Sequence, residues 1–265
     1  RFLDGLSIAG NLVSKSVSFA PDPGAPESRV CGRKATMMEK IVKRVLRLCG
    51  RSRHRGYTFW NQKYKPMLRL MDDLERRGVD LGELRALEIF GRDGLDHTTT
   101  YANRVKSLEV WELDPKWHPV LVKNLPGATV RTVDSYAEVA RTPDRFDLIM
   151  IDNAIGKNGD RYDHFDLFPD AVFKATADES LLVLIVIPAI DGKTLKHFPE
   201  LLDKEYLERR KSFYAADAPV SIPLEHVVGV YRSFAERNGY RLLWAHHQAR
   251  SGAGVRYLAL KIKRN

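Results

Sequence analysis

The chain of 265 residues contains only two cysteines, Cys31 and Cys49. Two cysteines at this separation provide neither a disulfide framework nor the closely spaced cysteine pair of a zinc site. Small disulfide-stapled secreted domains and cysteine-type zinc modules are therefore excluded. We expect a protein of the reducing cytoplasm.

Long hydrophobic runs are also absent, and no apolar stretch reaches the roughly 18 residues of a membrane-spanning helix. The longest run, LLVLIVIPAI at 181–190, contains a proline and is typical of a buried strand. Residues 1–36 lack the compact apolar segment and the small-residue cleavage site of a clear signal peptide. They are rich in Ser, Pro and Gly, so we expect a disordered leader or a non-native segment there.

Acidic residues are scarce in the first part of the chain. Residues 1–77 carry a net charge of +10, whereas residues 78–265 carry −1. Apolar residues at helical spacing predict a basic helix over 37–55 and a second helix over 64–78. We expect residues 37–80 to form a basic helical arm. It either packs on the body as a lid or brace, or touches a membrane surface or a polyanion such as nucleic acid.

From residue 85 onward, short runs of β-branched and aliphatic residues alternate with stretches of helical pattern. This alternation predicts βαβ units and a parallel sheet with helices on both faces. The expected strands are 85–90, 107–114, 128–134, 146–152 and 180–188, and the expected helices are 96–105, 115–124, 135–141 and 163–176.

The C-terminal part breaks this rhythm. After a helix expected over 225–240, the strands 241–248 and 255–263 are joined by the turn ARSGAG and predict an antiparallel hairpin. The expected fold is α/β, a Rossmann-like doubly wound and mostly parallel seven-stranded sheet with an antiparallel C-terminal hairpin, plus the N-terminal helical arm. Residues 81–265 would form this domain, and the insertion 189–224 would cap a ligand site at the strand ends.

Glycines and carboxylates gather where the expected strands end. Gly91 and Gly94 follow the first strand and let the backbone approach a ligand closely. Glu112 and Asp114 end the second strand and can accept hydrogen bonds from ribose hydroxyls. The alternative is an ordinary strand-to-helix turn with solvated acids.

The third strand ends in Asp134 and Ser135, where the carboxylate could meet an adenine amino group. The full dinucleotide pattern G-x-G-x-x-G is absent. The ordered set of acids and glycines therefore predicts an adenosine-bearing cofactor rather than a dinucleotide.

Four segments carry a family resemblance, namely LEIFGRDG, LEVWELDPKW, TVDS and FDLIMIDNA. With the terminal hairpin, residues 85–263 resemble the class I S-adenosylmethionine-dependent methyltransferases. The resemblance implies S-adenosylmethionine as cofactor, with Glu112 on its ribose and His97 either on its methionine carboxylate or capping the next helix. Phe90 stands where a glycine is common, so a differently shaped loop is expected. The cofactor-binding residues expected are Glu88, Gly91, Gly94, His97, Glu112, Asp114, Asp134, Ser135 and Asp152.

The segment FDLIMIDNAIGKNGDRY resembles the catechol-type small-molecule O-methyltransferases, in which an aspartate at the position of Asp152 binds a divalent metal. Those enzymes carry an Asp-Asn pair at the end of the fifth strand. This chain has Ile187 and Pro188 there, and no carboxylate before Asp191. Because a hard cation needs several oxygen ligands, we expect no metal site and no dependence on a divalent metal.

Methyl transfer from a sulfonium to a hydroxyl requires an aligned nucleophile and a base. The candidate catalytic residues are Asp152, which would orient the acceptor, and His164, whose pKa range suits a base. The alternatives are a structural cap for Asp152 and a surface helix position for His164. Tyr57, Phe59 and Trp60 would line an acceptor pocket or join the arm to the body.

Three functions remain open from sequence. The first is O-methylation of a small molecule or a glycan hydroxyl, with 189–224 as the acceptor cap. The second is a nucleic-acid or protein methyltransferase that uses the basic arm, although DNAIG is not the motif of amino-group methylation on bases. The third is a non-catalytic, cofactor-binding regulatory module. Peripheral membrane contact and homo-oligomerisation are left open, and His246 and His247 are expected at the surface or against a partner.

Overall fold

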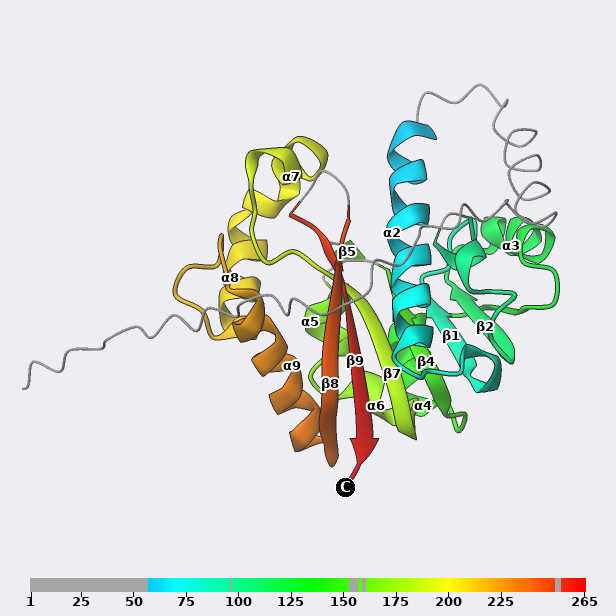
Figure 1. The fold of residues 1–265 in the computed structure, drawn as a ribbon. Helices are drawn as coiled ribbons and strands as arrows, with labels where there is room; N and C mark the ends of the chain where they lie inside the picture. The colour runs from blue at the N-terminus through cyan, green and yellow to red at the C-terminus, as the bar shows by residue number, and fades with distance from the viewer. Residues whose placement is uncertain (1–56, 96, 153–156, 159–160, 251–253) are drawn as a thin grey trace, which may run out of the picture. The chain divides into compact units, whose positions relative to one another are not determined.

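A seven-stranded mixed sheet forms the centre of the described residues, in the order β3-β2-β1-β4-β7-β9-β8 (Figure 1). The computed structural model describes residues 57–265 except 96, 153–156, 159–160 and 251–253. The leader 1–36 and the basic helix predicted over 37–55 lie outside the described residues. No helix in the described part of the chain is long and apolar enough to cross a membrane.

Strands β1 to β4 and β7 run parallel, whereas β9 is antiparallel to both of its neighbours. The predicted fold class, including the C-terminal hairpin, is therefore confirmed. The strands of the sheet are β1 (Arg85–Ile89), β2 (Ser107–Glu112), β3 (Thr129–Thr132), β4 (Phe146–Ile151), β7 (Thr176–Val186), β8 (Tyr240–Ala249) and β9 (Arg256–Arg264). A separate two-stranded ribbon pairs β5 (Lys157–Asn158) with β6 (Arg161–Tyr162).

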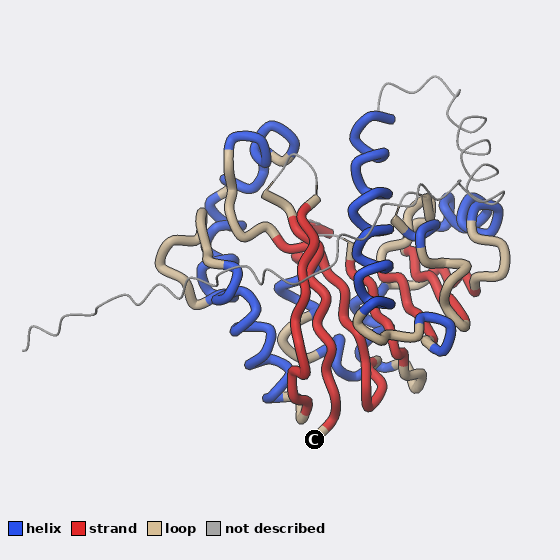
Figure 2. The backbone as a smooth tube through the Cα atoms, viewed as in Figure 1, coloured by secondary structure: helices blue, strands red, loops and turns tan. Residues whose placement is uncertain are grey.

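Helices flank the strands along the chain (Figure 2). The α-helices are α2 (Tyr57–Arg76), α3 (His118–Asn124), α4 (Ser135–Arg141), α5 (Asp163–Leu167), α6 (Ala171–Lys174), α7 (Gly192–His197), α8 (Lys204–Tyr214) and α9 (Leu224–Arg237). Short 3-10 helices are η1 (Leu81–Glu83), η2 (Thr98–Thr100), η3 (Pro115–Trp117) and η4 (Pro199–Leu202).

The continuous apolar run of β7 serves two hydrophobic cores. Leu182, Leu184 and Val186 belong to one cluster, and Leu181 and Val183 belong to the other. Successive side chains of a strand point to opposite faces, so one core lies on each face of the sheet. This is why the run shows no polar alternation: both faces of the strand are buried.

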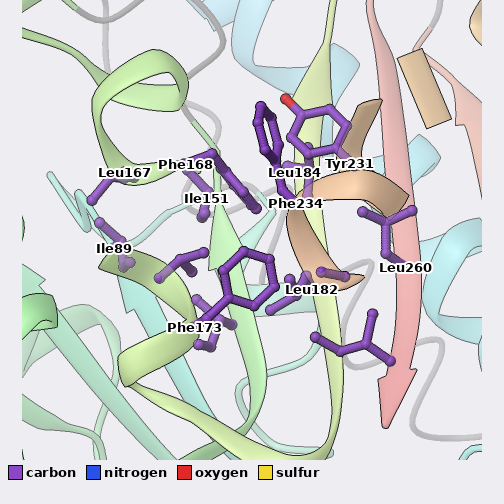
Figure 3. Packing of buried hydrophobic residues seen from close by; sticks show 14 of the residues in the cluster. Ile89, Ile151, Leu167, Phe168, Phe173, Leu182, Leu184, Tyr231, Phe234 and Leu260 are labelled. Atoms are coloured by element: carbon purple, nitrogen blue, oxygen red, sulfur yellow. The ribbon is translucent and has the colours of Figure 1, made fainter. Parts of the chain in front are cut away.

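One core packs the helices after β4 and before β8 against the sheet (Figure 3). Phe168 contacts Tyr231 and Phe173 through edge-to-face ring pairs with centroids 4.9 and 5.8 Å apart. Such aromatic pairs contribute specific orientation in addition to buried area. They fix α9 over this face of the sheet.

Helix α2 packs on the other core, in which Met67, Leu70, Met71 and Leu74 are fully buried. These residues recur at three- and four-residue spacing, so they form one apolar face of the helix. The described part of the arm thus packs on the body, and its role as a lid or a brace remains a prediction. The side chains of residues 57–64, including the aromatic candidates, lie outside the description.

Histidine 246 on β8 joins the sheet to α2. Its Nε2 lies 3.2 Å from Asp73 Oδ2, and its Nδ1 lies 3.2 Å from an Arg77 guanidinium nitrogen. The His246 side chain is partly exposed, at 19%, and its ring contacts α2, so its expected role at the surface or against a partner remains a prediction.

The α-helix predicted over 96–105 is wrong. Between β1 and β2, the described residues form one three-residue 3-10 helix, Thr98–Thr100, and turns. Three consecutive threonines are poor helix formers because β-branching restricts χ1 and the hydroxyls compete for backbone groups. The Thr100 hydroxyl indeed donates to the His97 carbonyl at 2.6 Å.

The helix predicted over 163–176 is also wrong in extent. It is divided into α5 and α6, with Pro169 between them. Proline lacks the N–H that a continuing helix requires. Strand β7 already begins at Thr176, which pairs with Phe146 of β4.

Candidate functional site

The loop after β1 contains three left-handed residues at alternate positions. Phe90, Arg92 and Gly94 have φ angles of 66°, 46° and 66°. Only glycine adopts this region without a steric penalty, so two of the three positions are strained. Strain of this kind gathers at ligand sites, where the surroundings hold the backbone in place. The differently shaped loop expected from Phe90 therefore has three left-handed positions, and only one of them, Gly94, is a glycine.

The two glycines of the loop are required by packing. A Cβ on Gly91 would lie 2.1 Å from Val110 Cγ1 on β2. A Cβ on Gly94 would lie 2.8 Å from Leu121 Cδ2 and 2.7 Å from Leu125 Cδ1. The backbone of this loop therefore lies directly against β2 and the C-terminal end of α3. The close approach of a ligand that the sequence predicted for these glycines remains a prediction.

Glu112 at the end of β2 faces the same loop. Its Oε2 accepts a hydrogen bond from the Arg92 backbone N–H at 2.7 Å, and its Oε1 accepts one from Asp114 N–H at 2.9 Å. Each carboxylate oxygen can accept a further bond. The structure thus brings together the two sequence motifs that were expected to hold a nucleoside.

Asp114 and Asp134 act as caps in the structure. Asp114 accepts from Lys116 N–H at 3.1 Å and pairs with the same lysine's ammonium. These bonds to Lys116 lower the pKa of Asp114. Asp134 accepts from Tyr136 N–H at 3.0 Å at the start of α4, where Ser135 is buried. Their expected cofactor contacts remain predictions.

A buried charged cluster joins β1 to β4. His97 Nε2 lies 2.7 Å from Glu88 Oε1, and His97 Nδ1 lies 2.7 Å from Asp152 Oδ2. The Tyr101 hydroxyl donates to the second oxygen of Glu88. Glu88 is fully buried, while the side chains of His97 and Asp152 are 11% and 4% exposed. We call these four side chains the His97 cluster.

The His97 cluster keeps its histidine charged. Burial opposes the imidazolium, but the charges of Asp152 and Glu88 and their hydrogen bonds outweigh it and raise the pKa of His97 to about 9. At neutral pH an imidazolium therefore lies between the carboxyl groups of Glu88 and Asp152. His97 makes no side-chain capping bond to η2, so the cap alternative is wrong.

The cluster lies at the point where the strand order reverses. From β1 the sheet runs through β2 to β3 on one side and through β4 to β7 on the other. In open α/β sheets, ligands bind in the crevice outside the carboxyl ends of strands at this switch point. Glu88 is the second-last residue of β1, and Asp152 directly follows β4, so both lie at this switch point.

Two parts of the site were not found from sequence. Tyr101 was missed because no sequence pattern distinguishes a tyrosine whose hydroxyl bonds to a site residue from one that only packs in the core. Arg92 was missed because no sequence signal marks a left-handed arginine; its guanidinium lies over the Trp117 ring at 5.8 Å. His164 has its backbone in α5, and its side chain lies outside the description. Among the described residues, no group of three or more potential ligands could hold a metal ion.

The insertion 189–224 is anchored at the same edge by a buried arginine. The Arg210 guanidinium donates to the carbonyls of Ile187, Pro188 and Pro219 and lies over the Tyr214 ring at 5.1 Å. Arg210 is 1% exposed. The insertion is thus attached to the end of β7, where the sequence predicted a cap.

No protein-family model matches the chain, and no curated protein matches it. The magnesium protoporphyrin IX methyltransferase of Synechocystis PCC 6803, a structure with bound SAH, is similar to 85% of this chain and 94% of its own, with 14% identity and a TM-score of 0.51. The N-methyltransferase NodS of Bradyrhizobium japonicum WM9 has 16% identity over 76% of this chain and 97% of its own, with a TM-score of 0.47.

A third structure, the 1,6-didemethyltoxoflavin-N1-methyltransferase of Burkholderia thailandensis, has 12% identity over 88% of this chain and 92% of its own, with a TM-score of 0.48. Of these three, the Synechocystis enzyme supports the assignment of the fold, together with the strand order and the antiparallel β9. The described part of the chain therefore has the Rossmann-like fold of S-adenosylmethionine-dependent methyltransferases.

Proposed function

We propose that this chain is an S-adenosylmethionine-dependent methyltransferase. The observation that carries the proposal is the closure of the left-handed loop onto Glu112, with a 2.7 Å bond from Arg92 N–H to its carboxylate. The two oxygens of Glu112 keep lone pairs for the two hydroxyls of a ribose. Gly91 and Gly94 keep the loop backbone flat against the sheet, so that a ligand can approach it.

The donor set at the strand ends fits the cofactor. Glu112 would hold the ribose, and Asp134 with Ser135 would lie on the adenine side. The His97 cluster places the carboxyl groups of Glu88 and Asp152 at the switch point, near where a ligand with a sulfonium and an ammonium group would lie. When bound, S-adenosylmethionine supplies an activated methyl group for in-line displacement.

The chain's own groups would divide the remaining work. Asp152 is paired with a charged histidine, so we assign it to orientation of the acceptor rather than to proton removal. His97 as an imidazolium has no free lone pair and is not a base at neutral pH. Proton acceptance from an acceptor hydroxyl would then fall to His164, on the helix that follows β6.

The acceptor we propose is a hydroxyl of a small molecule or glycan. Residues 78–265 carry a net charge of −1, which does not suit a polyanion. The insertion 189–224 lies after β7 and would cap the acceptor. The net charge of +10 in residues 1–77 favours the nucleic-acid or protein alternative. The pairing of Asp152 with His97 favours the non-catalytic binding module.

Calorimetric titration with S-adenosylmethionine and S-adenosylhomocysteine, followed by transfer of labelled methyl to a panel of hydroxyl acceptors, tests the proposal. Binding with transfer to a small acceptor supports it. Binding without transfer to any acceptor favours the regulatory module. Transfer to polynucleotide that falls steeply with salt favours the nucleic-acid alternative. No binding of either compound overturns the methyltransferase proposal.

A further inference from the structure

The described loop between β1 and β2, where the sequence predicted the first helix, lacks the continuous backbone bonding of an α-helix. Its backbone bonds close single turns, such as Thr100 N–H to the His97 carbonyl at 3.0 Å and Arg104 N–H to the Tyr101 carbonyl at 2.8 Å. A continuous helix would supply one such bond per residue and hold its own shape. This loop has to obtain its shape from outside contacts.

Those outside contacts lie at its two ends. Toward β2, Arg104 forms ion pairs with Asp72 and Glu75 of α2 at 3.0 and 2.6 Å. Toward β1, His97 and Tyr101 contact Glu88. The strained residues Phe90 and Arg92 lie between Glu88 and His97 in the chain. The contact between the Glu88 and His97 side chains therefore links the two ends of the strained segment.

The ring nitrogens of His97 face one carboxylate each. Among the described residues, the groups facing the imidazole are Glu88 from β1, Asp152 after β4 and the Thr98 hydroxyl, 3.4 Å from Nε2; Tyr101 acts through Glu88. A neutral imidazole has one N–H and would present a lone pair to one of the carboxylates. Only the doubly protonated ring carries an N–H on each nitrogen and so presents a positive charge to both carboxylates.

We propose that His97 is the positioning residue of the cofactor site, and that its imidazolium ties β1 to β4 and so holds the strained loop in the conformation that receives the cofactor. This rests on the proposed function. His97 need not touch the reacting atoms; it acts through the loop and through Glu88 and Asp152.

Loss of the proton removes one of the two bonds and leaves two buried carboxylates without a cation between them. The loop then loses its attachment to β4 or to β1. The affinity for cofactor should therefore fall as the pH rises past the titration of His97, which lies near pH 9. A histidine that only fills space would not give this dependence.

The test compares His97→Gln with the wild type by titration with S-adenosylhomocysteine from about pH 7 to about pH 10. A glutamine keeps hydrogen-bonding capacity but has no charge to lose. The ratio of the two dissociation constants cancels the titration of the ligand itself. We expect the dissociation constant of His97→Gln to be about ten times that of the wild type near pH 7, and the two constants to become equal above pH 9. His246→Gln, which removes a His–Asp pair on β8, should follow the wild type at every pH.

If the two dissociation constants are equal at pH 7, or if their ratio does not change with pH, the inference is wrong. Binding to the wild type in that case leaves the proposed function intact. Absence of wild-type binding at every pH overturns the proposed function, and the inference with it. If His97→Gln fails to fold, hydrogen exchange of the wild type decides. We compare the amide exchange rate of residues 97–106, corrected for the intrinsic rate, with that of β4. This rate ratio should increase when the pH is raised past 9; a rate ratio that does not change with pH contradicts the proposal.

Discussion

The carboxylate of Glu112 accepts a hydrogen bond from the backbone N–H of Arg92, 2.7 Å away on the neighbouring strand's loop. An acid predicted to hold a ribose thus also holds the loop beside it. Substitution of Glu112 should affect both the ligand and the loop.

Glu112→Gln should weaken the binding of S-adenosylmethionine by about 1–3 kcal/mol, because a charge-assisted acceptor is replaced by a neutral amide that accepts through one atom only. Isothermal titration of both proteins measures this. Glu83→Gln is the control, because Glu83 is exposed and its pairing with Lys106 is 3.6 Å long. Equal affinity for Glu112→Gln and wild type would remove Glu112 from the site.

Gly91→Ala should lower the free energy of unfolding by about 1–3 kcal/mol, because the added methyl would overlap Val110 Cγ1. Urea unfolding measures the loss. Combined with Val110→Ala, it should destabilise less than the sum of the two single changes, since the clash is removed. Gly229→Ala is the matched control: it lies in α9 with open space around its Cβ and should stabilise by about 0.5–1 kcal/mol.

The stability of the fold should fall as the pH rises from about 6.5 to about 9. The pKa of His97 is raised in the folded protein, so its contribution is complete below the unfolded value of 6.5 and is lost as the pH passes about 9. The loss is on the order of 3 kcal/mol for a shift of this size. Urea midpoints measured at both ends of this range should differ in the wild type and differ less in His97→Gln. The reverse slope would contradict a charged His97.

Arg210→Met should destabilise the protein and loosen the insertion. The change removes the arginine donor from the carbonyls of Ile187 and Pro219, whereas the Pro188 carbonyl keeps a bond from Ile222 N–H at 2.9 Å. A buried acceptor left unsatisfied, as at Ile187, costs about 1–3 kcal/mol. Unfolding and limited proteolysis of residues 189–224 measure the two effects. Arg209→Met is the control, because Arg209 is more exposed and pairs with Asp166 at 3.0 Å; similar losses in both variants would argue against a specific anchor.

The strands of the sheet could be predicted because they are short runs rich in β-branched and aliphatic residues, separated by turns or helical stretches. The run 181–187 is apolar throughout, and the structure places residues 181–186 in β7, between β4 and β9, with a core on each face of the sheet. The helix over 96–105 could not be excluded by the same reasoning. Its failure depends on the three threonines and on tertiary bonds of His97 and Tyr101, which override a weak local preference.

The site was predictable residue by residue but not as an arrangement. Glu88 and Asp152 were placed at strand ends, which meet at one edge of a parallel sheet, and His97 was placed at the start of the helix expected after the first strand. Their joining in one ion cluster depends on the register of β1 against β4, in which Ile89 pairs with Ile151. No sequence pattern fixes that register or the charge of the histidine.

Phe90 and Arg92 show that this loop requires left-handed backbone conformations at set positions, and not glycine at each of them. A search pattern written as a row of glycines passes over LEIFGRDG, although the backbone makes the same turns at alternate positions. A template written in backbone handedness would find it. Chains whose neighbouring bonds can hold two large left-handed residues in place therefore escape a pattern made of glycines alone, and the path of their main chain reveals the shared turn.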